Sequence, residues 1–135
     1  MICLDTNAVI GLINSTSARL RQRFDAQLAG GGAMTIPAVV LFELSYGAAN
    51  SERPKENHTI VKEFLGGPVA VLDFTAEDAI EAGDIRASLE RKGTPIGPYD
   101  ILIAAQARRH GALLVTANLR EFKRVPRLRT ENWET

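Results

Sequence analysis

Four acidic residues, spread over most of the chain, have the side chains best suited to chemistry: Asp5, Glu43, Asp100 and Glu121. Carboxylates that converge without a cation repel one another, which raises their pKa values and costs stability. A divalent cation removes that conflict, and oxygen ligands without His or Cys favour Mg²⁺ or Mn²⁺ over zinc. One or two such ions could activate water and orient a phosphodiester for in-line attack. If the fold brings the four acids together, they indicate hydrolysis of a phosphodiester.

Each acid also has a structural interpretation when it is taken alone. Asp5 precedes a helical pattern and could simply cap it. Asp100 lies in the first turn of an apolar helix, whose dipole would stabilise its charge. Glu43 is the only charge in the segment from Ile36 to Ala49, where an ionised carboxylate is costly unless donors or a cation compensate it. It could instead lie on the solvent edge of a partly buried helix, and Glu121 could be an ordinary surface acid.

The elements that must position these acids alternate between short apolar runs and longer helical patterns. We expect strands at Met1–Leu4, Ala33–Ile36, Val69–Asp73 and Ala112–Thr116, with a short fifth strand at Leu128–Thr130. We expect helices from Asp5 to Leu28 with a break at Asn14–Ser17, from Pro37 to about Ala49, from Pro54 to Gly66, from a capping box at Thr75–Asp78 to Gly93, and from Tyr99 to His110. This alternation predicts a parallel α/β sheet with right-handed crossovers, in which ligands gather outside the carboxyl ends of the strands. Asp5 and Glu121 each follow such an end.

The composition predicts one globular domain spanning residues 1–135. A chain of 135 residues with 45% hydrophobic residues is long enough to bury one core. It shows no long apolar run and no leader-like segment, so we expect a cytoplasmic protein that does not contact a membrane. The only cysteine, Cys3, lies in an apolar stretch and is expected to be a buried thiol, so no disulfide framework or zinc site is available. Walker and dinucleotide-binding glycine motifs are absent.

The charge is balanced overall but uneven along the chain. The formal net charge is zero, so the chain as a whole does not have the strongly basic character of many nucleic-acid binders. Near the C-terminal end, however, Glu121 is the only acid among Arg108, Arg109, Arg120, Lys123, Arg124, Arg127 and Arg129. This basic surplus could contact phosphates, or it could form a solvated face with charges at a helix end.

Four motifs resemble, in order and spacing, those of the PIN-domain nucleases and, within them, the VapC toxins of bacterial toxin–antitoxin modules. They read Leu-Asp5-Thr-Asn, Leu-Phe-Glu43-Leu-Ser-Tyr-Gly-Ala, Gly97-Pro-Tyr-Asp100-Ile-Leu-Ile-Ala-Ala, and Leu-Val-Thr116-Ala-Asn118-Leu-Arg-Glu121-Phe122. The resemblance extends over essentially the whole chain, and the ordered set is far more specific than any single motif.

The resemblance implies a three-layer α/β/α sandwich with a central four- to five-stranded parallel sheet. It assigns Asp5, Glu43 and Asp100 to the binding of Mg²⁺ or Mn²⁺, and it places Glu121 at a fourth acidic position that is Asp in many members. We expect the supporting polar residues to be Thr6, Asn7, Thr116 and Asn118.

The resemblance also implies a substrate and partners. Members cut RNA endonucleolytically, leaving a 5′-phosphate and a 3′-hydroxyl, and thereby inhibit translation. They form homodimers and are silenced by a cognate VapB-type antitoxin, whose tail occupies the active-site groove and through which the complex binds its promoter DNA. The segment from Gly97 to Trp133 is most similar to the branch that cuts initiator tRNA in its anticodon stem-loop. We expect the RNA backbone to be held by Arg120, Lys123 and Arg124.

Two other functions are compatible with parts of this pattern. A catalytically silent RNA-binding or antitoxin-binding module could keep the fold, although four retained acids argue against it. A phosphotransferase of the haloacid-dehalogenase type would carry a second Asp two residues after Asp5, and Asn7 occupies that position.

Overall fold

The computed structural model describes all residues, 1–135, and is built around one five-stranded parallel sheet. The strands are β1 (Ile2–Leu4), β2 (Met34–Pro37), β3 (Val69–Leu72), β4 (Leu113–Val115) and β5 (Arg129–Glu131). Their order across the sheet is β3-β2-β1-β4-β5, and every neighbouring pair is parallel. The prediction of a parallel α/β sheet is therefore confirmed, and the short fifth strand expected at Leu128–Thr130 is present as β5.

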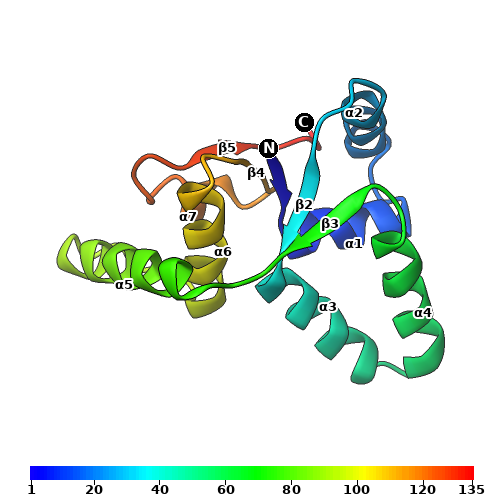
Figure 1. The fold of residues 1–135 in the computed structure, drawn as a ribbon, viewed down its shortest axis with the longest axis horizontal. Coiled ribbons are helices and arrows are strands. Elements are labelled where there is room, and N and C mark those ends of the chain that lie inside the picture. Colours follow the sequence, from blue (N-terminus) through cyan, green and yellow to red (C-terminus); the bar gives the residue numbers. More distant parts are fainter.

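Helices cover both faces of this sheet. They are α1 (Thr6–Asn14), α2 (Ala18–Ala29), α3 (Ala38–Ala49), α4 (Pro54–Leu65), α5 (Ala76–Arg91), α6 (Pro98–Arg109) and α7 (Leu119–Phe122). In Figure 1, α1, α2 and α4 lie toward the right, α3 lies below the strands, and α5 to α7 lie toward the left. The chain travels outward from β1 to β3, and then returns to β4 on the other side of β1. Right-handed crossovers in opposite directions place their helices on opposite faces, which gives the predicted α/β/α layers.

The helix boundaries follow from local capping. The predicted break in the first helical region occurs at Ser15, which has a left-handed φ of 53°, and Ser17 then caps α2 by accepting a hydrogen bond from the Leu20 amide. The predicted capping box of α5 is present, because Thr75 and Asp78 each accept from the other's backbone amide. These polar side chains satisfy amides that a helix leaves unpaired at its start.

Two predictions about local structure were incomplete or wrong. Pro37 was expected in the first turn of α3, but it ends β2 and pairs with Leu72 of β3. Its φ of −60° suits either conformation, and its ψ of 147° is extended. The helix α7 was not predicted, because four residues are too few to show a helical period.

The core surrounds the central strands and includes 28 buried hydrophobic residues. All three residues of β1 are buried, and Cys3 lies within this core as expected, with its Sγ 3.3 Å from the Thr35 Oγ1. None of the helices combines the length and apolar character that crossing a membrane requires.

The strand order places a crevice at the carboxyl ends of β1 and β4. These strands are adjacent, with Leu4 paired to Val115, but the chain leaves them toward opposite faces of the sheet. Open α/β sheets bind ligands at such a reversal of strand order. Asp5 and Thr116, the residues that immediately follow the two strands, therefore lie at the mouth of this crevice.

Candidate active site

Asp5 lies at the carboxyl end of β1 and is only 6% exposed. Its Oδ1 accepts a 2.8 Å hydrogen bond from the Ala8 amide, so it caps α1. Burial raises the pKa of Asp5; hydrogen bonds from Thr116 and the Ala8 amide lower it, and the charges of Glu43 and Glu134 raise it further. The net result is a raised pKa, which means that the protein does not fully compensate the ionised form of this carboxylate.

Glu43 belongs to α3, in the connection from β2 to β3, and its side chain contacts the start of α1. Its Oε1 accepts a 2.6 Å hydrogen bond from the Thr6 hydroxyl, the first residue of α1. The side chain is half-buried. Both sequence interpretations therefore describe part of its environment, since it lies at the edge of a mostly apolar helix and also receives a strong donor.

Asp100 lies in the first turn of α6 and is the most strongly perturbed acid of the site. Burial is the largest cause; next come a hydrogen bond and the charge of Glu121, and then the charges of Glu43 and Asp5. Together these raise the pKa of Asp100 to about 6. Asp100 and Glu121 thus share a proton-binding contact, and the negative charges of all four predicted acids act on one another.

Glu121 is positioned by the short segment after β4. The Thr116 hydroxyl accepts a 2.9 Å hydrogen bond from the Asn118 amide, and the Asn118 Nδ2 donates to the Glu121 Oε2 at 3.1 Å. This chain of contacts begins α7 and turns Glu121 toward Asp100 on α6. Thr116 and Asn118 thus form a hydrogen-bonded chain to Glu121, and their supporting role stays a prediction.

A pocket of about 120 Å³ lies between these acids. Three of the four acids line it, together with other polar and apolar side chains: Asp5, Thr6, Asn7, Glu43, Asp100, Ile103, Asn118 and Phe122. No Lys or Arg is among them, so no basic side chain of the chain neutralises the carboxylates from within the pocket. No three acids are arranged, as the side chains lie, so that they could hold one metal ion.

Comparison with known proteins identifies the family of this chain. Residues 2–128 match the PIN domain family. The tRNA(fMet)-specific endonuclease VapC of Salmonella typhimurium is 44% identical to this chain over 130 residues, which are 96% of both proteins. The chain belongs to the VapC ribonucleases of the PIN-domain family.

Solved VapC structures share the whole fold. VapBC2 from Rickettsia felis, bound to a DNA fragment from its promoter, superposes with a TM-score of 0.91 at 36% identity, covering 98% of this chain and 99% of that one. DNA-bound VapBC from Salmonella typhimurium gives a TM-score of 0.89 at 43% identity with the same coverage. The family resemblance found in the motifs is thus confirmed over nearly the full length.

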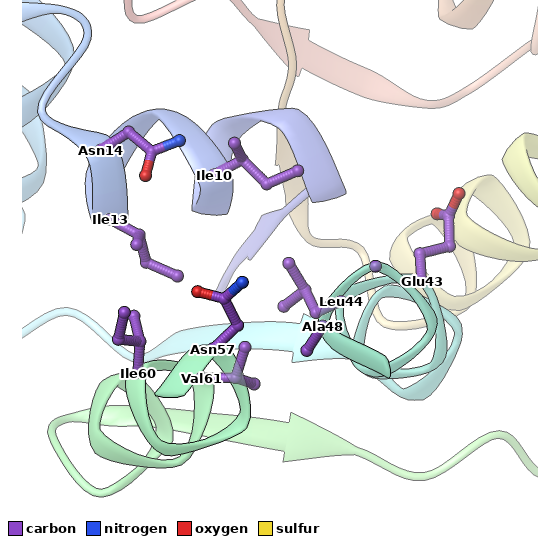
Figure 2. A pocket seen from close by; sticks show the side chains of 10 residues that line it. Ile10, Ile13, Asn14, Glu43, Leu44, Ala48, Asn57, Ile60 and Val61 are labelled. Carbon is purple, nitrogen blue, oxygen red and sulfur yellow. The ribbon is translucent and has the colours of Figure 1, made fainter. Parts of the chain in front are cut away.

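A second, larger pocket adjoins the acidic site of this VapC chain. It has a volume of about 320 Å³ and is lined by α1, α3 and α4, with Glu43 at its edge. Figure 2 shows Ile13 and Ile60 on opposite walls, while the carboxylate of Glu43 points away from these apolar side chains. Ile10 and Ile60 are each about two-fifths exposed. An apolar groove therefore leads to the acidic pocket.

The basic residues of the C-terminal region have different surroundings. Arg108 and Arg109 pair with acids of α5, so part of the basic surplus is structural. Arg124 donates to the Pro95 carbonyl at 2.9 Å, in the loop that leads to Asp100. The side chains of Arg120 and Lys123 are exposed, which leaves them accessible to phosphates.

Sequence reasoning missed three residues of this VapC site. Ile103 and Phe122 form apolar walls of the acidic pocket, and Glu134 contributes to the raised pKa of Asp5. Ile103 follows Asp100 by three residues, a spacing that places two side chains on one helix face, so that signal was available. Nothing local connects Glu134 with Asp5, because the contact depends on how the C-terminal segment packs.

Proposed function

We propose that this chain is a metal-dependent endoribonuclease toxin of a type II toxin–antitoxin system. One observation carries the proposal: Asp5, Glu43 and Asp100 surround a single pocket without a basic partner, in a chain that is 44% identical to a tRNA(fMet)-specific endonuclease. Burying carboxylates without a counter-charge is unfavourable, and natural proteins accept that cost where a ligand supplies the charge.

The donor set fits Mg²⁺ or Mn²⁺. It offers carboxylate oxygens and no His or Cys. Burial, followed by the neighbouring acids, raises the pKa of Asp100, which is consistent with a site that a cation completes. We assign the metal site to Asp5, Glu43 and Asp100, with Glu121 as a fourth acid. The side chains would have to rotate inward to bind an ion, because no three of them are arranged to hold one as they lie. When bound, the metal would lower the pKa of water and neutralise charge at the phosphodiester.

The remaining polar groups orient these acids. Thr6 fixes one oxygen of Glu43, leaving the other free for a ligand. Asn118 holds one oxygen of Glu121 in the same way, and Thr116 in turn holds Asn118. Asn7 borders the pocket and is exposed, so its amide is available to a phosphate oxygen. Such fixed contacts reduce the reorganisation that binding and catalysis require.

The proposed substrate is RNA, specifically initiator tRNA cut in its anticodon stem-loop. The Salmonella typhimurium and Shigella flexneri relatives, at 44% and 45% identity, are both tRNA(fMet)-specific endonucleases. Arg120, Lys123 and Arg124 are proposed to hold the RNA backbone, Arg124 in addition to its contact with Pro95. Phosphate contacts of this kind position a substrate without reading its bases.

The proposed partner is a VapB-type antitoxin. The similar structures are VapBC complexes bound to DNA, and the apolar groove between α1, α3 and α4 offers a site for an apolar segment that ends at the acids. We further propose that residues 1–135 act as one domain in a cytoplasmic homodimer, and that promoter DNA is contacted only through the antitoxin.

A cleavage assay tests the proposal directly. The purified protein, freed of metal by chelator and exchanged into defined buffer, is incubated with a labelled tRNA pool and increasing Mg²⁺ or Mn²⁺. We expect cleavage that requires the metal and is abolished by added chelator, and sequencing of the new ends should identify one tRNA and a 5′-phosphate product. Tight RNA binding with no cleavage under any metal would support the silent binding module instead.

A further inference from the structure

Two aromatic rings lie on the surface immediately beside the proposed active site. Phe42 precedes Glu43 on α3, and Tyr99 precedes Asp100 on α6. The ring centroids are 5.4 Å apart with an angle of 56° between the planes. The rings are 50% and 48% exposed, although each belongs to a residue type that usually packs in a core or interface. From this placement, and resting on the proposed RNA cleavage, we infer that Phe42 and Tyr99 form a stacking platform for an unpaired nucleobase of the substrate.

A structural role explains this pair poorly. The other aromatic pair of the chain, Phe24 and Phe64, has centroids 6.3 Å apart and belongs to the core, where Phe24 is only 4% exposed. Phe42 and Tyr99 instead remain half-exposed while supporting each other across two helices. Their mutual contact fixes the position of both rings relative to Glu43 and Asp100. Each ring therefore offers a face to a ligand at a defined place beside the acids.

The charge of the site explains why such a platform would be needed. The acidic pocket repels the anionic RNA backbone, and no basic side chain lines it. A bound metal would offset this repulsion only at the reacting phosphodiester, so further binding energy beside it must come from groups that do not depend on charge. Unpaired RNA bases stack on aromatic side chains, and every base has a face that can do so. A base in a loop of the substrate, next to the cleaved bond, is thus the ligand class that fits both rings.

The test uses the full-length protein in two forms. In the Asp100→Asn background, which is expected to bind RNA without cutting it, a stem-loop RNA carries the fluorescent base 2-aminopurine at successive loop positions. In the otherwise unaltered enzyme, KM and kcat are measured with the unlabelled stem-loop. Both forms receive Phe42→Leu or Tyr99→Leu, which remove the ring but keep an apolar side chain, and Tyr99→Phe, which keeps the ring. Ile80→Ala is the control, because Ile80 is an apolar residue on α5 that is 70% exposed.

We expect one loop position to show fluorescence quenching on binding, and we expect both leucine variants to lose it. Each leucine variant should raise KM about tenfold, at the lower end of what one stacked base contributes, with little change in kcat. Tyr99→Phe and Ile80→Ala should behave as the unaltered enzyme. Unchanged KM and quenching in the leucine variants would overturn the inference. So would a loss of activity that accompanies dissociation of a dimer in light scattering, because the rings would then contact a second copy of the chain.

These outcomes are separable from failure of the proposed function. If the unaltered enzyme cuts no RNA with Mg²⁺ or Mn²⁺, the proposed nuclease is wrong, and the stacking platform is overturned with it. If the enzyme cuts RNA and the leucine variants match it, only the platform is wrong. Thermal unfolding of every variant shows whether a change in KM has a trivial cause in lost stability.

Discussion

Two regions of this molecule withdraw an aspartate from solvent near other acids. The pKa of the aspartate is lowered in one region and raised in the other. Between α5 and α6, the side chain of Asp78 is fully buried. Burial alone would raise its pKa, but hydrogen bonds and charge from Arg109, with the Thr75 amide, lower it. At the acidic pocket, Asp100 has no such partner, and burial and Glu121 raise its pKa to about 6.

The difference separates acids that stabilise the fold from acids that we propose bind a metal. A carboxylate that the chain pairs with its own guanidinium contributes to the packing of α5 on α6. A carboxylate that the chain surrounds with other acids weakens the fold until a cation arrives. Both regions withdraw an aspartate from solvent, Asp78 fully and Asp100 partly, but only Asp78 has an internal counter-charge, and that is the informative difference.

The largest effect is expected from removing a charge in the acidic pocket. Asp5→Asn and Asp100→Asn keep the side-chain shape but remove the negative charge. We expect cleavage to fall on the order of 10³-fold, because losing several kcal/mol of metal-dependent transition-state stabilisation corresponds to such a factor. Single-turnover cleavage of the mapped RNA measures the change, and circular dichroism verifies that folding is intact. Retained activity in either variant would exclude that acid from the metal site.

At the α5–α6 contact we expect the opposite result, which is a loss of stability without a loss of activity. Asp78→Ala removes the buried partner of Arg109 and the Asp78 half of the α5 capping box, while Thr75 remains as the N-cap. We expect the free energy of unfolding to decrease by about 2 kcal/mol, as for the loss of a hydrogen bond to a charged group, while the cleavage rate of the folded fraction is unchanged. Urea unfolding measures the first quantity.

Glu77→Ala is the matched control for that variant. Glu77 pairs with the same Arg109 at 3.0 Å, but its side chain is 76% exposed. An exposed ion pair contributes less than about 1 kcal/mol, so the control should lose much less stability than Asp78→Ala. Equal losses would show that burial of the aspartate is not what makes the α5–α6 pair structural.

Sequence reasoning located most of the acidic pocket because Asp5 follows a strand, Asp100 begins a helix and Glu43 is the only charge in an apolar segment. Asp5 shows the limit of that reasoning. Capping and function were weighed as alternatives, yet the same carboxylate caps α1 and borders the pocket. One oxygen bonds the Ala8 amide, so the residue can do both, and no local pattern distinguishes a cap that also serves a site.

The other features that the sequence did not predict are either very short elements or contacts that form only in the tertiary structure. The helix α7 has four residues, fewer than the helical period needs, so the bond from Asn118 to Glu121 was not foreseen. Pro37 is compatible with either a strand end or a helix start. Its pairing with Leu72 makes it the end of β2. The pairing of Arg109 with Asp78 joins two helices whose packing only the fold reveals.

Glu121 should matter less than the other acids. Glu121→Gln keeps the side-chain length and an oxygen that can accept from Asn118, but it removes the charge beside Asp100. We expect cleavage to fall about tenfold, equivalent to about 1.4 kcal/mol of transition-state stabilisation. Glu121→Asp, which keeps the charge, should retain most activity. A loss from Glu121→Gln as large as that from Asp100→Asn would instead make Glu121 an equal member of the metal site.

The smallest effect concerns stability in the absence of metal. The folded pKa of Asp100 is about 6 against an ordinary value of 3.8, so the folded state binds a proton more tightly than the unfolded state between those values. The stability that protonated Asp100 contributes to the folded state is complete below pH 3.8 and is lost as pH rises through about 6. With chelator present, the melting temperature of Asp100→Asn should match that of the unaltered protein near pH 4. At pH 7 the variant should melt a few degrees higher, which corresponds to about 1 kcal/mol in the free energy of unfolding after solvent screening. Adding Mn²⁺ at pH 7 should reverse that order.

The α5–α6 contact should respond to pH with the opposite sign, which makes it the internal reference for that measurement. The pKa of Asp78 is lowered in the folded protein, so its contribution is present above pH 3.8 and is lost as pH falls below that value. The stability deficit of Asp78→Ala should therefore be constant from pH 5 to 8 and shrink only in acid, with no response to Mn²⁺. If both variants showed the same pH and metal dependence, the internal counter-charge would not distinguish the two regions. Opposite dependences would instead identify the acidic pocket as the place where the chain leaves a charge for a metal to supply.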